Sequence, residues 1–247
     1  VFRPAPKQQL QLNVSGGDST TTYALSGEYF SQEGVVFGSG LRRGSFRTKI
    51  ESQVTDRLTA AASLYLAETS EKLDDPNVMT AALTISPIAS VKDDEGNYMT
   101  NADLAAQYGS FFFSKGNPVA MAKEVDEKQI NTHFIGNGYF EYELLDHLVL
   151  KSSLGADINH GTYNYYVPDG IPYLYRIETG GTATKSSSKY LSWLNENTLK
   201  YNNEFGNHDI DLTLGATFQE MDYSNLTATA EDFTDDFYKY NDLSLGN

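Results

Sequence analysis

The stretch "NHDIDLTLGATFQ", residues 207–219, determines which fold class the sequence predicts. Every second residue from Ile210 to Phe218 is apolar, and the residues between them are polar or glycine. A repeat of two is the period of a β-strand, whose side chains alternate between two faces. One face should therefore meet an apolar environment, either a protein core or lipid, while the other meets water.

The same alternation recurs in seven further stretches, which we predict to be strands. These stretches are residues 10–14, 21–30, 45–54, 57–70, 132–145, 147–160 and 188–203. The last of them is ambiguous, because Asn195 and Asn197 share a face with Trp193 and Leu199. Together with the first stretch, they predict an all-β chain of about eight strands.

Short and long links alternate strictly between the predicted strands. Residues typical of tight turns surround Gly16, Asp56, Asp146 and Gly206. Every second link of an antiparallel meander returns to the same end, so all short turns should lie at one end and all long loops at the other. The long links cover residues 31–42, 70–128, 160–188 and the residues from 222 onward.

Outer-membrane barrels have this asymmetry, with short periplasmic turns and long extracellular loops. We therefore predict an antiparallel, up-and-down transmembrane β-barrel in the cell outer membrane, with residues 70–128 and 160–188 as extracellular loops. Parity places the start of the first strand and the end of the eighth outside, so we expect further strands on both sides of this slice of a larger barrel. A secreted or surface β-sandwich that binds glycans is the alternative, and a self-contained eight-stranded barrel is opposed by parity.

The composition disfavours several other classes of protein. The 247 residues include no cysteine, which removes disulfides, thiolate metal sites and a cysteine nucleophile. The net charge of −15 has the wrong sign for a nucleic-acid partner. No run of about 18 apolar residues is present, so we predict no transmembrane helix.

Four stretches, taken in order, resemble the SusC/RagA-type TonB-dependent transporters of the outer membrane. They are residues 1–50, "ALTISPIASVKDDEGNY" (82–98), residues 117–159 with "FIGNGYFEYELLDHLVLKSSLGADIN", and "WLNENTLKYNNEFGNHDIDLTLGATFQ" (193–219). This ordered set covers nearly the whole chain. The resemblance implies strands two to nine of a 22-stranded barrel, without the plug domain and the TonB box.

The resemblance also implies what the parent barrel does. It implies import of nutrient oligosaccharides or peptides across the outer membrane, with a SusD-like surface lipoprotein as lid. The TonB complex would supply energy through the plug region. The barrel would contact outer-membrane lipid and perform no chemistry on its substrate, so we expect no cofactor.

Two groups of residues are the predicted contact sites. The apolar face of the first stretch should meet lipid, while Asp211 and Thr213 face the interior. Aromatic side chains in the 160–188 loop can stack on sugars or on a partner, although packing within the loop is the alternative. The lipid-facing residues are Ile210, Leu212, Leu214 and Phe218, and the loop tyrosines are Tyr163, Tyr165, Tyr166, Tyr173 and Tyr175.

The remaining polar motifs predict neither a metal site nor a catalytic site. Asp93, Asp94 and Glu95 could ligate a hard cation, but their spacing is not that of an EF-hand, and Gly96 favours a solvated turn. Residues 76–86 read as a short helix within the long loop. No nucleophile elbow is present, so we predict no catalytic residues and no enzyme activity. The four histidines also lack metal-binding spacing; they are His133, His147, His160 and His208.

Overall fold

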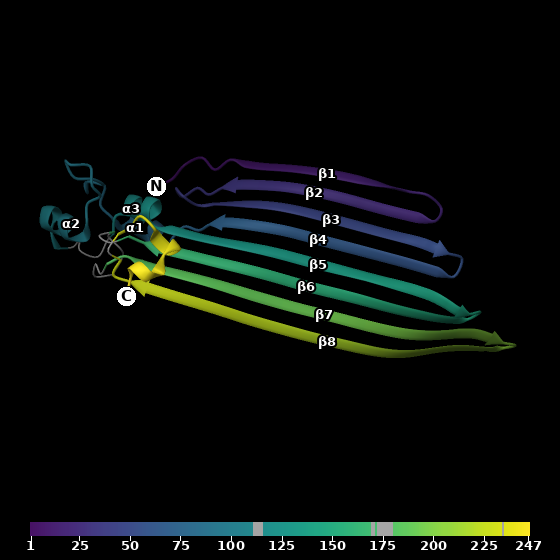
Figure 1. The fold of residues 1–247 in the computed structure, drawn as a ribbon. Coiled ribbons are helices and arrows are strands. Elements are labelled where there is room, and N and C mark those ends of the chain that lie inside the picture. Colours follow the sequence, from purple (N-terminus) through teal and green to yellow (C-terminus); the bar gives the residue numbers. More distant parts are fainter. Residues whose placement is uncertain (111–115, 169–170, 172–179, 234) are drawn as a thin grey trace.

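The computed structural model describes residues 1–110, 116–168, 171, 180–233 and 235–247. Eight antiparallel strands form one sheet in the order of the chain (Figure 1). This confirms the predicted all-β, up-and-down architecture. The strands are β1 (Lys7–Gly17), β2 (Thr21–Glu33), β3 (Gly40–Thr55), β4 (Leu58–Lys72), β5 (Asp126–Leu145), β6 (Leu148–Val167), β7 (Thr182–Phe205) and β8 (His208–Glu231).

Short and long links lie at opposite ends of the sheet, as predicted. Figure 1 shows all four hairpin turns at one end, here called the turn end, and both chain termini with all helices at the other, here called the loop end. The turns are residues 18–20, 56–57, 146–147 and 206–207. Gly206 takes a φ of 65°, a left-handed conformation that suits glycine in a two-residue hairpin.

The predicted bounds of two long links are wrong, because the strands continue beyond their apolar residues. The link predicted over 31–42 covers only residues 34–39, and the one predicted over 160–188 covers residues 168–181. Tyr163 pairs with Ser186 in the β6–β7 register, well inside the predicted loop. The link predicted over 70–128 is nearly right, since it covers residues 73–125.

The long link between β4 and β5 folds into three helices, and its described residues are here called the cap. The helices are α1 (Pro76–Thr84), α2 (Asn101–Tyr108) and α3 (Pro118–Glu124). The helix predicted over 76–86 is confirmed. It begins at the buried Asp75, whose side chain accepts a hydrogen bond from the backbone of Asn77. No helix among the described residues is both long enough and apolar enough to cross a membrane.

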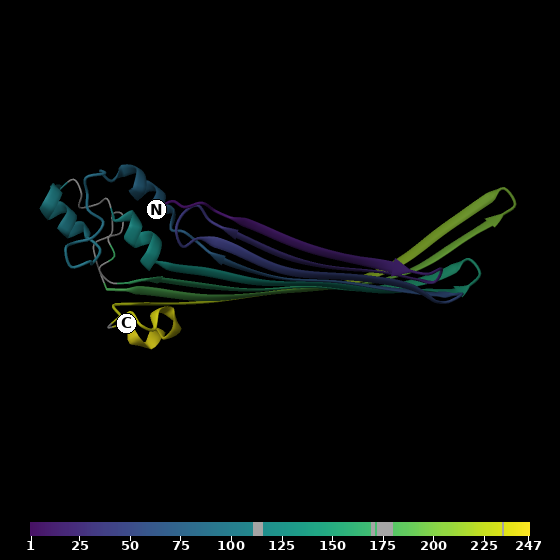
Figure 2. The same cartoon turned by 90° about the horizontal axis from the view of Figure 1, so that it is seen from above.

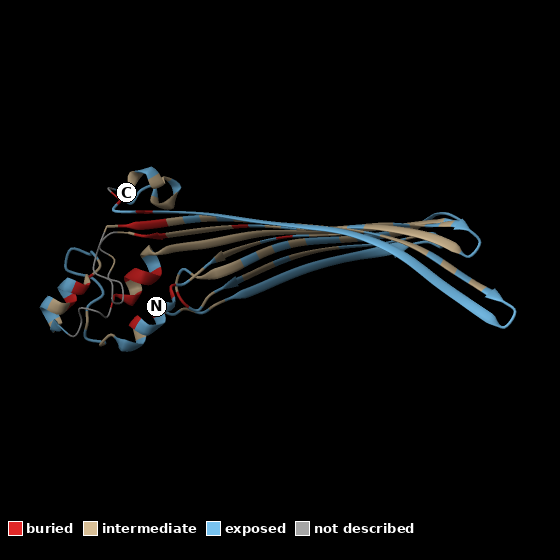
Figure 3. Cartoon of the chain, turned by 90° about the horizontal axis from the view of Figure 1, so that it is seen from below, coloured by how far each residue is buried: buried red, intermediate tan, exposed pale blue. Residues whose placement is uncertain are grey.

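Burial is concentrated at the loop end, whereas the sheet is a single layer (Figure 3). Val78, Ala81 and Met121 of the cap pack with Val36 of the β2–β3 link. All residues of β1 are exposed, and β8 has a single buried residue, because each of these strands forms an edge. Figure 2 shows the sheet nearly edge-on, with the β7–β8 hairpin turning away from the other strands at the turn end.

Candidate functional site

The register defines two faces of the sheet, because residues directly opposite each other on neighbouring strands point the same way. The row through Leu12 runs through Gly27, Phe46, Leu66 and Phe134 and continues through Ile158 and Leu191. The face that carries this row is here called the apolar face. Its large side chains include Leu10, Val14, Tyr23, Leu25, Tyr29, Ile50, Leu64, Phe140, Tyr142, Leu150, Leu154, Trp193, Leu199, Tyr201, Ile210, Leu212, Leu214 and Phe218.

Much of the apolar face is open. Leu10 is 72% exposed, Leu154 57% and Phe218 58%. A water-soluble protein rarely leaves a continuous apolar surface of this extent uncovered. The face therefore requires an apolar environment.

The other face, here called the polar face, carries ion pairs between neighbouring strands. Lys151 pairs with Glu141 at 3.4 Å and Lys200 with Asp211 at 3.1 Å. Further polar contacts on this face include Arg43 with Glu28 at 2.6 Å, His133 with Asp157 at 2.8 Å, and Arg47 stacked over Tyr65 with its guanidinium 5.0 Å from the ring centre. A face of this composition suits water or a polar ligand.

The apolar residues form a band that crosses the strands obliquely, here called the belt. On β2 the belt runs from Tyr23 to Tyr29 and is centred on Ser26, whose row crosses β5 at Ile135. On β8 it runs from Ile210 to Phe218 and is centred on Leu214, whose row crosses β5 at Tyr142.

Counted along β5, the row at the centre of the belt therefore moves by about seven residues, from Ile135 to Tyr142, between β2 and β8. These two strands are six strand spacings apart. With about 3.3 Å per residue and about 4.8 Å between strands, this corresponds to a tilt of about 40°. That value lies within the tilt of about 35–45° that strands of membrane barrels have.

A chain of polar groups interrupts the middle of the belt, where the sequence was ambiguous. The hydroxyl of Ser152 donates to Oδ1 of Asn197 at 2.6 Å. Asn197 Nδ2 donates to Oδ1 of Asn195 at 2.7 Å, and Asn195 Nδ2 donates to the backbone carbonyl of Ser153 at 2.9 Å. The amides satisfy one another within the sheet, which makes them compatible with apolar surroundings.

At the loop end, buried asparagine side chains hold the cap together. Asn117 Nδ2 donates to the carbonyl of Val91 at 2.7 Å, while its Oδ1 caps the first turn of α3. Asn101 Oδ1 accepts from the backbone of Gly116 at 3.0 Å. Helices α2 and α3 were not predicted from the sequence. Their signals were the Asn-Pro pair at 117–118 and the capping box from Thr100 to Asp103.

The outer surface of the cap carries exposed apolar side chains. Leu83 is 76% exposed, Ile88 70% and Met79 41%. A hollow of about 350 Å³ lies between the cap and the N-terminal residues Val1 and Phe2. Such a cluster on a folded loop is typical of a contact surface.

The predicted tyrosine cluster is divided between the two faces. Tyr163 and Tyr165 lie on β6 and project from the polar face, so their assignment to a loop was wrong. The Tyr163 hydroxyl donates to Glu127 at 2.9 Å. Burial, together with this hydrogen bond, raises the pKa of Tyr163, which therefore keeps its proton. Burial also raises the pKa of Glu127, against the opposing effect of the Tyr163 hydrogen bond.

Tyr166 lies on the opposite face and is fully buried. It packs with Ala183, Ala230 and Phe233, and the C-terminal residues Tyr240, Leu243 and Leu245 cover this cluster. Its hydroxyl donates to Asp236. Tyr166 is thus a packing residue in this structure. The other two predicted contacts, Tyr173 and Tyr175, lie outside the described residues.

The acid cluster forms the predicted turn. Asp93 Oδ1 accepts from the backbone of Glu95 at 3.0 Å and of Asn97 at 2.8 Å, and Gly96 has a φ of 91°. Burial acts to raise the pKa of Asp93, but the hydrogen bonds from Asn97, Glu95 and Gly96 together lower it. The described residues contain no group of three or more side chains that could hold a metal ion, and Asp94 and Glu95 are exposed at the turn.

Comparison with known proteins adds to this geometry. The chain is 30% identical over 251 positions to TonB-dependent receptor P3 of Formosa agariphila. This alignment covers 100% of the chain and 25% of that protein. It is 25% identical over 248 positions to TonB-dependent receptor P26 of the same organism, covering 99% of the chain and 24% of the relative. This chain is homologous to TonB-dependent receptors. It spans about a quarter of the length of the curated relatives it matches.

Solved structures show the same fold as this TonB-dependent receptor homologue. The RagAB peptide importer in its closed-closed state superimposes with a TM-score of 0.75 at 21% identity, over 100% of this chain and 27% of that one. The RagAB peptide transporter gives a TM-score of 0.72 at 20% identity, with the same coverage. No family model matches the sequence. The eight-stranded sheet thus corresponds to part of the barrel of a RagA-like transporter.

Proposed function

We propose that residues 1–247 form one section of the barrel wall of an outer-membrane, TonB-dependent nutrient importer. The observation that supports this most directly is the oblique belt. A transmembrane barrel needs an apolar band of constant height, and tilted strands must cross such a band at the tilt angle. A β-sandwich would cover its apolar face with a second sheet, whereas the described residues form one sheet.

In the proposed orientation the apolar face meets lipid and the polar face lines the interior. Ile210, Leu212, Leu214 and Phe218 then contact lipid. The loop end lies outside the cell, with the cap and residues 168–181, and the turn end lies in the periplasm. The edges of β1 and β8 pair with further strands of the parent barrel, which removes unpaired backbone groups from the membrane.

The proposed cargo is an oligosaccharide or a peptide, taken up with a SusD-like lipoprotein as lid and with energy from the TonB complex. The family resemblance supports both kinds of cargo, the lid and the energy source. The RagAB proteins, which share the fold, are peptide importers by name. Tyr163 and Tyr165 support the same role, because they project from the polar face near the cap. The chain acts by binding and enclosure, with no chemical step.

Cysteine probes in the parent protein, meaning the longer chain that we propose to contain these residues, test the location and topology. Asp94 is exposed at the tip of the cap turn, and Asn207 is exposed in the β7–β8 turn. The parent should fractionate with the outer membrane. Asp94→Cys should react with an impermeant maleimide on intact cells, and Asn207→Cys only after the outer membrane is opened. Recovery in the soluble fraction refutes the location, and the reverse labelling pattern inverts the topology.

The exposed apolar residues of the cap provide a second test, directed at the lid. Leu83 and Ile88 are the most exposed apolar residues of the cap, so we propose that they contact the lipoprotein. Leu83→Glu with Ile88→Glu should reduce co-purification of the lipoprotein at least tenfold, because each charge would be buried without a partner. The control is Thr80→Glu, an exposed position on α1. Equal co-purification of the double variant and the control would contradict the contact.

A further inference from the structure

Two hollows adjoin on the apolar face over strands β1–β5. The lower one is an apolar groove of about 540 Å³, lined among others by Leu12, Tyr29, Phe46 and Leu66. Gly27 and Gly44 lie on its floor, and a Cβ atom added at either would meet nothing within 4 Å. The groove therefore exists because two side chains are missing from the belt.

The upper hollow is a polar pocket of about 230 Å³. It begins one row above the groove: Tyr29, Gly44 and Glu68 form the top row of the groove, and Ser31, Arg42 and Ser70 form the next row on the same face. Lys72 and Lys128 oppose each other in the row above that. Rows on one face are about 6.6 Å apart, so the two hollows adjoin along the strands.

The pocket holds an excess of positive charge that the protein does not neutralise. Among the described residues, Arg42, Lys72 and Lys128 take part in no ion pair, although the whole chain has a net charge of −15. Two carboxylates on the same face are already paired: Glu33, in the row of Lys72 and Lys128, pairs with Arg3, and Asp126, one row above Lys128, pairs with Lys239. Glu68, one row below Ser70 on β4, takes part in no ion pair among the described residues. Three unpaired cations beside a single unpaired carboxylate favour the binding of an anion.

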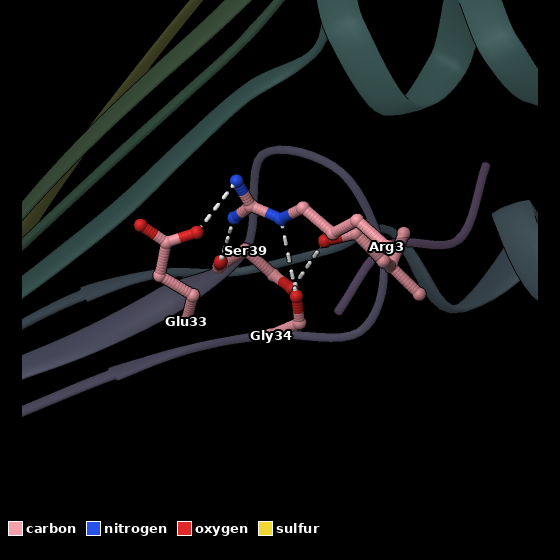
Figure 4. Close-up of polar contacts among 5 residues, drawn as sticks. Arg3, Glu33, Gly34 and Ser39 are labelled. Carbon is pink, nitrogen blue, oxygen red and sulfur yellow. Dashed lines mark hydrogen bonds and ion pairs between the residues drawn. The ribbon is translucent and has the colours of Figure 1, made fainter. Parts of the chain in front are cut away.

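Arg3 lines the same pocket and is held by polar contacts with the end of β2 and the β2–β3 link (Figure 4). Arg3 pairs with Glu33 at 2.8 Å and donates to the carbonyls of Gly34 at 3.3 Å and Ser39 at 3.1 Å. A side chain at position 34 would force Ser39 to shift, because a Cβ atom would lie 1.9 Å from the Ser39 hydroxyl oxygen. Arg3 is thus occupied in holding the β2–β3 link, which leaves the other three cations for a ligand.

We propose that these hollows bind a phosphorylated lipid of the outer leaflet, with its phosphate among Arg42, Lys72 and Lys128 and an acyl chain in the groove over Gly27 and Gly44. The inference rests on the proposed membrane location. The vertical order of the two hollows supports a lipid over a free anion: the groove lies within the outer half of the belt, and the cations lie just beyond it, at the height of headgroups. Basic pockets beside membrane-spanning elements recognise anionic headgroups in this way.

The test uses the purified parent protein and native mass spectrometry. The probes are a bis-phosphorylated, acylated glucosamine disaccharide (lipid A), the same lipid without phosphates, and inorganic phosphate. Lipid A should bind, and either of the other two should bind at least tenfold more weakly. Arg42→Gln should weaken lipid A binding about fivefold, and adding Lys128→Gln should weaken it further by a similar factor.

Matched variants separate the two parts of the site. Gly44→Leu fills the groove and should weaken lipid A binding without affecting the weak binding of inorganic phosphate. Glu68→Gln should tighten lipid A binding. Arg47→Gln lies on the same strand as Arg42 but on the polar face, and should leave the affinity unchanged.

Two outcomes would overturn the site. Equal lipid A affinity of wild type, Arg42→Gln and Gly44→Leu would refute it while leaving the proposed function intact, provided that the variants still fractionate with the outer membrane. Tight binding of inorganic phosphate that displaces lipid A would reduce the site to an anion pocket without a lipid. Absence of the wild-type parent from the outer membrane would refute the proposed function and the lipid site together.

Discussion

At the scale of single residues, the amide side chains near the middle of the belt have hydrogen-bond partners. Ser152, Asn195 and Asn197 lie near the middle of the belt and are linked by hydrogen bonds to one another and to the backbone. Placing an amide in lipid without a hydrogen-bond partner costs a free energy of several kcal/mol. The alternation alone left β7 ambiguous, because a sequence pattern cannot show which amides satisfy each other.

The orientation of the two faces can be tested at adjacent residues of β8. Leu214 is 60% exposed on the apolar face, and Thr213 lies on the polar face. A charged side chain near the middle of the lipid costs about 2–4 kcal/mol, whereas one in the interior costs little. Leu214→Arg in the parent protein should therefore impair barrel assembly much more than Thr213→Arg. Assembly is measured as the fraction of protein that resists unfolding by detergent at room temperature, and equal fractions for both variants would contradict the orientation.

At the scale of elements, the sequence predicted the eight strands and the four tight turns, because alternation and turn residues are local signals. It underestimated the strands at the loop end. From Gly161 to Val167, β6 leaves the belt and loses its apolar alternation, yet its backbone still pairs with β5 and β7. Pairing of this kind depends on the neighbouring strand, so no single stretch of sequence reports it.

The candidate contact sites were less predictable than the strands. Tyr163 and Tyr166 are three residues apart and were grouped by composition, but an odd separation places them on opposite faces. The residues that cover Tyr166 belong to the C-terminal segment, which is far away in the sequence. The lining of the two hollows on the apolar face depends on register across five strands, which only the structure supplies.

The turn at Asp93 gives a prediction for the cap. Its carboxylate accepts hydrogen bonds from the backbone of Glu95 and Asn97, while that of Asp94 makes no such bonds. Asp93→Ala should therefore increase cleavage of the cap by added protease at pH 7, whereas Asp94→Ala, with the same change in charge, should leave the rate unchanged. Equal rates for the two variants would show that the turn does not depend on the Asp93 carboxylate.

The same carboxylate predicts the pH dependence of the turn. Folding lowers the pKa of Asp93 below its ordinary value of 3.8, so the ionised form stabilises the turn. This stabilisation should be complete above pH 3.8 and should be lost as the pH falls through the lowered pKa. Hydrogen exchange at the amide of Asn97, corrected for its intrinsic pH dependence, measures this. Protection of the Asn97 amide should not change with pH in Asp93→Ala. If protection in the wild type were equally independent of pH, the ionised Asp93 carboxylate would not be what stabilises the turn.

At the scale of the whole molecule, the oblique belt predicts the depth of residues far apart in the sheet. Leu64 and Glu220 lie in the same row, which runs through Gly136, Ala156 and Trp193, whereas Leu214 lies in a different row. With strands tilted by about 40°, Leu64 and Leu214 share the middle of the membrane, and Glu220 lies about 15 Å nearer the headgroups.

Nitroxide labels at these three positions in the membrane-embedded parent protein measure the depths. Labels at Leu64 and Leu214 should collide often with oxygen and rarely with a water-soluble nickel complex. The label at Glu220 should show a higher ratio of nickel to oxygen collisions. Equal ratios at Leu64 and Glu220, with a different one at Leu214, would mean that the strands are not tilted and that the belt is not a membrane band.

The length of the β7–β8 pair has a mechanical consequence. These strands are joined along 24 residue pairs, from Thr182 with Glu231 to Phe205 with His208. A pull along the strand axis loads all the ladder's hydrogen bonds in shear at the same time, whereas a pull across the sheet breaks them one after another. In the proposed orientation, traction applied from the periplasmic side would act mainly along the strands. The β7–β8 section of the wall should then bear that force without unzipping.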